Sequence, residues 1–153
     1  MKYINKFIDI FDYRGYGESS EFEIDNNIYI YPHFQDDVKT MIDYCRKSHT
    51  SIFNLYGWGI GDGWALGIGY QRNEIKKIIA DTPFLSLEDL EVRFEDWEEP
   101  MEVPFAGCDK MHEPLYTLNS APGKNLQQIK LIIGSNDMLF RKADMKMLQV
   151  KSK

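Results

Sequence analysis

The most regular pattern of apolar and polar positions in this chain has the period of a helix. It begins at Asp36 and Asp37, which suit a helix N-terminus because they can cap free N–H groups and face the positive end of the helix dipole. Basic residues follow at the far end. Between them, four residues at the i, i+3, i+4, i+7 spacing predict one apolar face of a helix over residues 36–48: Val38, Met41, Ile42 and Cys45.

Runs of β-branched and aromatic residues predict strands elsewhere. Two pairs of such runs flank turn-like segments and indicate hairpins: 21–24 with 28–31, and 51–56 with 64–70. Single strands are expected at 87–94 and 128–133.

Helical spacing is weaker in the remaining segments. It predicts short helices at 3–11, 73–80 and 138–148 and one helical turn at 113–116. Asn136 and Asp137 suit the cap of the last helix, but they also suit the tip of a hairpin. Together these elements predict an α+β fold with a mostly antiparallel sheet, two to four helices and a single domain over residues 1–153.

Charge is distributed unevenly over the 153 residues, whose net charge is −6. Residues 88–102 contain eight acidic residues and one basic residue, whereas residues 124–153 carry seven basic residues against two acidic ones. An acidic chain is a poor general binder of nucleic acid, because such binding needs several Lys or Arg contacts to phosphates. The chain has no apolar run long enough to span a membrane and no secretory signal, so a cytoplasmic protein is expected.

Six of the 11 glycines lie between Tyr56 and Tyr70, interleaved with tryptophans. A dinucleotide-binding G-x-G-x-x-G pattern fails here, because Asp62 or Trp64 stands where its last glycine is needed. The expected structure is a hairpin over 57–69 that presents Trp58, Asp62 and Trp64 to a partner or forms the floor of a pocket. The alternative is that the glycines make room for bulky neighbours and the tryptophans belong to the core.

The acidic segment surrounds one aromatic residue, Trp97. Charge steers the encounter with a basic protein and a buried indole prolongs the complex, so the segment is a second candidate docking surface. Its expected contact residues are Glu95, Asp96, Trp97, Glu98 and Glu99. A solvated edge strand kept soluble by its charges is the alternative.

Catalytic and metal motifs are missing from the sequence. Neither H-E-x-x-H nor G-x-S-x-G is present, and Cys45 and Cys108 are too far apart for a metal-binding or redox pair. No cofactor, metal or catalytic residue is therefore expected.

These observations favour a non-catalytic inhibitor that docks on a basic surface of another protein, such as a toxin or a nucleic-acid-processing enzyme. Immunity proteins and phage-encoded anti-defence proteins have this physical profile. Two alternatives remain: a small-molecule-binding protein or enzyme whose pocket is floored by the 57–69 hairpin, and a structural or assembly subunit.

Overall fold

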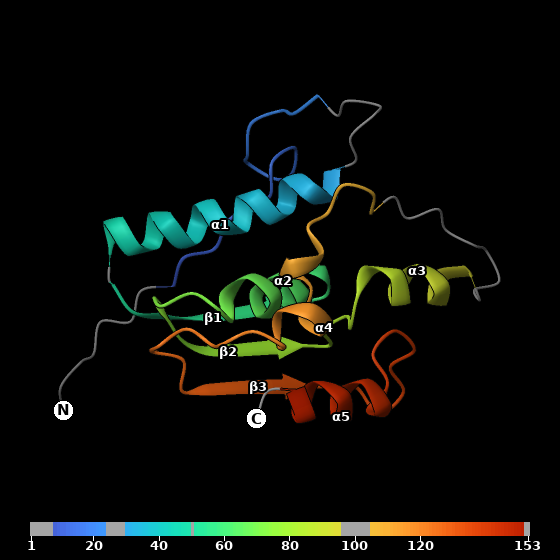
Figure 1. The fold of residues 1–153 in the computed structure, drawn as a ribbon. Helices are drawn as coiled ribbons and strands as arrows, with labels where there is room; N and C mark the ends of the chain where they lie inside the picture. Colours follow the sequence, from blue (N-terminus) through green and yellow to red (C-terminus); the bar gives the residue numbers. More distant parts are fainter. Residues whose placement is uncertain (1–7, 24–29, 50, 96–104, 152–153) are drawn as a thin grey trace.

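The computed structural model describes residues 8–23, 30–49, 51–95 and 105–151, which form a three-stranded sheet with helices packed on it (Figure 1). The strands are β1 (Phe53–Trp58), β2 (Ile75–Asp81) and β3 (Gln128–Ile132), and they lie in the order β1-β2-β3. The helices in these ranges are α1 (Ile30–Ser48), α2 (Ile60–Gly69), α3 (Leu87–Glu95), the 3-10 turn η1 (Lys110–His112), α4 (Pro114–Thr117) and α5 (Lys142–Lys151).

Both strand pairs are parallel, so the expectation of a mostly antiparallel sheet is wrong. Leu55 aligns with Ile78, and Ile78 aligns with Ile129. Parallel neighbours require a crossover connection. Here α2 returns the chain from the end of β1 to the start of β2, and the segment containing α3, η1 and α4 does the same between β2 and β3.

The amphipathic helix is confirmed, but it starts six residues earlier than expected. Helix α1 begins at Ile30 and includes Pro32 in its first turn, where a proline's missing N–H costs no hydrogen bond. Residues 30 and 31 are therefore helical and not part of a hairpin strand, and residues 21–23 form no strand. The helix expected over 3–11 is absent from residues 8–11, and its first part, like residues 24–29 of the hairpin, lies outside the described residues.

Three segments have the opposite secondary structure to that expected. Residues 64–69 of the expected strand 64–70 belong to helix α2. Residues 73–80, expected as a helix, contain most of strand β2, and residues 87–94, expected as a strand, form helix α3. Helix α3 begins after Ser86, whose hydroxyl accepts the N–H of Asp89 at 3.1 Å as an N-cap. The strand at 128–133, the turn at 113–116 and the last helix are confirmed, with α5 displaced to 142–151.

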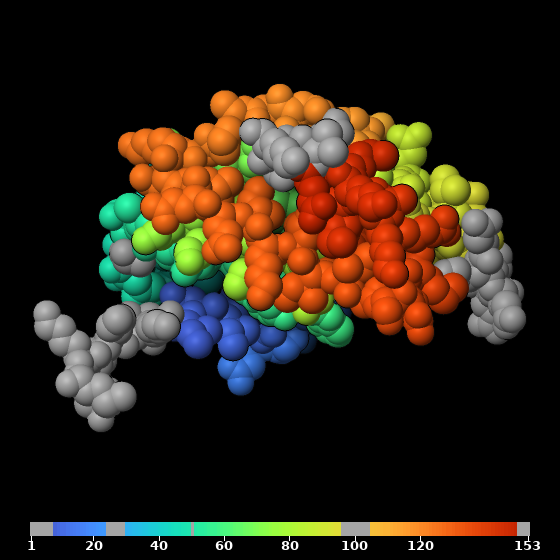
Figure 2. All heavy atoms as spheres, turned by 90° about the horizontal axis from the view of Figure 1, so that it is seen from below, coloured from blue at the N-terminus to red at the C-terminus, as the bar shows by residue number. Residues whose placement is uncertain are grey.

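Helix α2 lies between the two parts of the apolar core. On one side Leu66 packs with Ile75 and Ile78 of the central strand. On the other side Trp64 packs with Phe34 and Ile42 of α1 and with Phe84, which follows β2. Helix α5 adds Leu148 to the sheet side, and Figure 2 shows residues from the last third of the chain forming much of the face below β3. No helix in the described ranges is long and apolar enough to cross a membrane.

Candidate functional site

The loops that follow the three strands meet at one edge of the sheet, because parallel strands end on the same side. Gly59 follows β1, Thr82 follows β2, and Asp137 lies in the loop after β3; all three line one cavity. In open α/β sheets, ligands bind outside the carboxyl ends of the strands. This edge is therefore the candidate functional site.

The turn from β1 to α2 is sharp and depends on glycine. Gly59 has φ 61° and ψ −129°, a conformation that residues with a side chain rarely adopt. Gly57 packs so closely on the backbone of Gly61 and Asp62 that a Cβ would overlap it. The chain here runs from a strand through a turn at positive φ into a helix, and glycines lie two residues before and after the turn. Enzymes with the G-x-S-x-G motif present their nucleophile in this geometry. Here Gly59 occupies the nucleophile's position.

Glycines within α2 let the helix approach its neighbours at backbone distance. A Cβ at Gly63 would overlap the ring of Phe84, and one at Gly67 would overlap the carbonyl oxygen of His112. The helix is consequently buried on all sides from Asp62 to Gly69. The glycines therefore make room for neighbouring groups, which is the alternative that the sequence left open.

Thr82 is held in an unusual backbone conformation at the edge of the cavity. Its φ is 64°, which is a genuine outlier for a β-branched residue. The Thr82 N–H donates to the carbonyl of Ile132 at 2.9 Å, and its hydroxyl donates to the Asp81 carbonyl at 2.6 Å. Strained residues of this kind persist where surrounding structure fixes them, and they are concentrated at functional sites.

Asp137 is fixed by the loop that it begins. Its Oδ1 atom accepts the N–H groups of Leu139 at 2.9 Å and Phe140 at 2.8 Å. In the described part of the chain, Oδ2 has no hydrogen-bond partner, so this oxygen is free to meet solvent or a ligand. The carboxylate is half-buried and lines the cavity.

A second carboxyl group, that of Asp62, is buried in the first turn of α2. It is 0% exposed, and neither of its oxygens has a hydrogen-bond partner among the described residues. Burial raises the pKa of Asp62 to about 9, the Gly63 N–H opposes this rise, and the nearby charges of Asp81 and Asp137 add to it. Asp62 is therefore protonated and uncharged at neutral pH.

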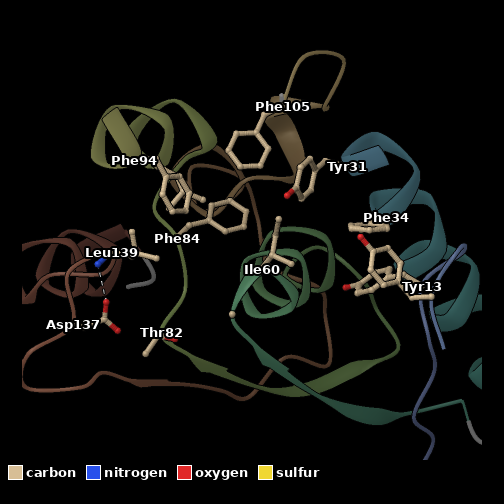
Figure 3. Close-up of a pocket in the computed structure, with 13 residues that line it drawn as sticks. Tyr13, Tyr31, Phe34, Ile60, Thr82, Phe84, Phe94, Phe105, Asp137 and Leu139 are labelled. Carbon is tan, nitrogen blue, oxygen red and sulfur yellow. Dashed lines mark hydrogen bonds between the residues drawn. The ribbon is translucent and has the colours of Figure 1, made fainter. Parts of the chain in front are cut away.

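The cavity has a volume of about 470 Å³ and mostly aromatic walls. One wall is built from Tyr13, Tyr16, Tyr31 and Phe34, and the ring centroid of Phe34 lies 4.4 Å from that of Tyr13. The other wall contains phenylalanines at positions 84, 94 and 105. Figure 3 shows the Ile60 side chain pointing up between Phe84 and Tyr31, and Asp137 with Thr82 at the opposite end from Tyr13. Asp137 and Thr82 are thus the polar side chains at the strand ends, and the tyrosine hydroxyls belong to the opposite wall.

The residues expected to form the first docking surface do not share a surface. Trp58 is 74% exposed at the end of β1, whereas Asp62 and Trp64 are both 0% exposed within α2. The hairpin that would have presented all three is replaced by a strand, a turn and a buried helix. Trp58 alone of the three is accessible, and its role in binding a partner stays a prediction.

The acidic docking surface lies mostly beyond the described residues. Glu95 is exposed at the end of α3. The remaining four residues, Asp96, Trp97, Glu98 and Glu99, lie outside the described residues, and the role of this surface stays a prediction.

The histidines and cysteines do not gather into a site. In the ranges that the structure describes, no group of three His, Cys, Asp or Glu side chains has the arrangement to hold a metal ion. Cys45 and Cys108 are both free thiols, and burial raises the pKa of Cys108 to about 12.

Sequence reasoning missed the residues that build the cavity. Tyr13, Phe105 and Asp137 are far apart in the chain, and no local motif connects them. One signal was available: Gly57-Trp58-Gly59-Ile60-Gly61 matches G-x-S-x-G at every position except the serine, which is a pattern for a strand–turn–helix.

No family model, curated protein or solved structure matches this chain.

Proposed function

We propose that the protein binds a small, largely apolar molecule in the cavity at the carboxyl edge of the sheet. The observation that carries the proposal is the cavity of about 470 Å³, with aromatic walls and two polar side chains, Thr82 and Asp137, at one end. Ligand pockets typically measure roughly 300–1,000 Å³ and combine apolar lining with a few polar groups that fix orientation. The strained Thr82 and the turn at Gly59 support the same location.

Binding, rather than acyl transfer through residue 59, is the activity that we propose for this site. The strand–turn–helix aims position 59 at the cavity, but glycine has no side chain to attack a carbonyl group. A Cβ built at Gly59 would meet nothing within 4 Å, so the space that a nucleophile would occupy is open to a ligand.

A fluorescent apolar probe tests the proposal. N-phenyl-1-naphthylamine is neutral and brightens in apolar surroundings, and we expect it to bind the protein saturably. Ile60→Trp places a larger side chain in the cavity and should abolish the signal. Val92→Trp makes a similar change at a residue that is 55% exposed on α3, and it should leave binding unchanged. A signal that survives Ile60→Trp would place the probe elsewhere and reject the proposal.

A protein partner is a second candidate, favoured by two exposed aromatic side chains. Tyr56 and Trp58 are 64% and 74% exposed on the face of β1 that points away from α2. Capture of one specific protein from the native host, lost with Trp58→Ser and kept with Tyr44→Ser on α1, would support this function. Capture that is unchanged by Trp58→Ser would exclude β1 as the docking surface.

A further inference from the structure

We propose that the ligand of this cavity is an organic cation, with an ammonium group on an apolar body, held between the aromatic wall and the Asp137 carboxylate. The inference rests on the proposed function and specifies the class of ligand. It is carried by the kind of side chains that line the cavity and by the sign of the charge at its polar end.

The tyrosine wall is one connected group of rings. Tyr31 lies with its centroid 5.6 Å from that of Phe34 and 4.7 Å from that of Phe105, both in edge-to-face arrangements. Tyr16 meets Phe34 in the same way at 5.8 Å. Aromatic rings carry negative charge on their faces and attract cations within about 6 Å of the centroid, most strongly where water is excluded. Such a wall suits an alkylated ammonium group as well as a neutral hydrocarbon.

The charge at the other end of the cavity favours an ammonium group over a neutral hydrocarbon. Among the described residues that line the cavity, Asp137 is the sole Asp or Glu, and no Lys or Arg lines it. Asp81 precedes the lining residue Thr82 but does not line the cavity, and its Oδ2 accepts the Tyr56 hydroxyl at 3.4 Å. The Asp137 carboxylate at one end of an apolar cavity favours a cation over a neutral or an anionic ligand.

The basic side chains next to the cavity are already paired. Arg14 follows Tyr13, and its Nε donates to Oδ1 of Asp37 at 2.8 Å. Arg93 of α3 contacts Asp144 at 2.8 Å and Asp89 at 2.7 Å. Since each guanidinium faces its own carboxylate, neither one supplies an uncompensated positive charge to the site.

One feature of the site, the N-terminus of α2, disfavours a cation. The N-terminus of α2 opens on the cavity at Ile60, and its free N–H groups and dipole favour an anion. The partial charge of a helix end is about half an elementary charge. It is therefore smaller than the full charge of Asp137, and the balance favours a cation.

The ligand class can be tested with three probes of similar shape. Phenyltrimethylammonium is the cation, tert-butylbenzene is its neutral isostere with carbon in place of nitrogen, and 4-tert-butylbenzoate is an anion with the same apolar body. Dissociation constants for the full chain would come from chemical-shift titrations. We expect the cation to bind about tenfold more tightly than its neutral isostere, the ratio that corresponds to one cation–π or charge interaction.

Two variants separate charge from shape. Asp137→Asn removes the charge but keeps an oxygen to accept the N–H groups of Leu139 and Phe140, so the loop should remain folded. It should remove the preference for the cation and leave the neutral isostere within twofold. Tyr31→Leu keeps an apolar wall without the ring and should weaken the cation selectively. Asp36→Asn is the matched control, since this exposed carboxylate on α1 does not line the cavity.

Each outcome decides between the inference and the function on which it rests. A cation preference that disappears in Asp137→Asn and persists in Asp36→Asn supports the inference. Equal or tighter binding of the neutral isostere or of the benzoate overturns the cation and leaves the apolar cavity as a binding site. Failure of all three probes, with no binding of N-phenyl-1-naphthylamine either, overturns the proposed function as well.

Discussion

Helices α1 and α2 pack against each other, but they are held in the fold by different means. Helix α1 places a stripe of side chains, Phe34, Val38 and Ile42, on the core and leaves its opposite face in solvent. Helix α2 is buried on all sides, and its glycines bring the helix backbone against Phe84 and the carbonyl of His112. The arrangement of α1 can be recognised from the local spacing of its apolar residues. The arrangement of α2 depends on the residues that its glycines contact, and those residues are far away in the sequence.

The largest expected effect comes from adding one methyl group to α2. Gly67→Ala should destabilise the protein by about 3 kcal/mol, because its Cβ would overlap the rigid backbone at His112. Helix propensity alone predicts the opposite sign, a gain of about 1 kcal/mol. Thr40→Ala on the exposed face of α1 should stay within about 0.5 kcal/mol. Denaturant unfolding measures both, and a stable Gly67→Ala protein would mean that α2 does not approach the η1–α4 segment so closely.

The buried carboxyl group of α2 should make the stability of the fold depend on pH. Asp36 of α1 is exposed and 3.2 Å from Lys39, whereas Asp62 of α2 is buried with its pKa raised to about 9. A carboxyl group with a raised pKa in the folded state stabilises the fold at low pH, and this stability is lost as pH rises from about 4 towards 9.

Relative to Asp62→Asn, the wild type should therefore lose stability with increasing pH, by on the order of 1 kcal/mol per unit between pH 5 and 8. Urea denaturation at several pH values provides the measurement, and parallel curves for the wild type and Asp62→Asn would show that Asp62 titrates normally.

A smaller difference in stability is expected between a substitution in the turn before α2 and one in the first turn of α2. Gly59→Ala should cost about 1–2 kcal/mol through its positive φ alone, because a Cβ there meets nothing within 4 Å. Gly61→Ala, two residues later in helical geometry, meets the Tyr13 hydroxyl at an ordinary 3.5 Å. It should be neutral or stabilising by up to about 1 kcal/mol. Equal thermal denaturation midpoints for the two variants would contradict the turn geometry.

The same distinction explains which elements could be predicted from the sequence. Helix α1 and strand β3 have patterns that identify them locally, and both were predicted. The pattern of large residues in the Trp64–Tyr70 run, next to a turn-like segment, predicted a strand, whereas the fit of Gly63 against Phe84 is a tertiary property. Strand β2 is a short apolar run whose Ile spacing does not distinguish strand from helix. Helix α3 had a usable signal in Ser86-Leu87-Glu88-Asp89, a capping pattern.

The candidate site was predictable only in its position along the chain. The glycine-rich stretch indicated residues 57–63 as unusual, and Gly59 and Ile60 do line the cavity. Tyr13 and Phe105 reach it through the packing of their segments against α1, which no spacing in the sequence expresses. Asp137 was considered as a cap or hairpin tip. Its place at the same end of the cavity as Thr82 follows from the parallel order of the sheet, which was itself predicted wrongly.

The central claim is that the protein binds a ligand at the carboxyl edge of the sheet. The most direct test is to measure amide chemical shifts during a titration with N-phenyl-1-naphthylamine. The account predicts saturable shifts at Gly59, Ile60, Thr82 and Leu139, which come from three separate loops and share only this cavity. Shifts confined to Tyr56 and Trp58 on the open face of β1, or no saturable shifts at all, would contradict it.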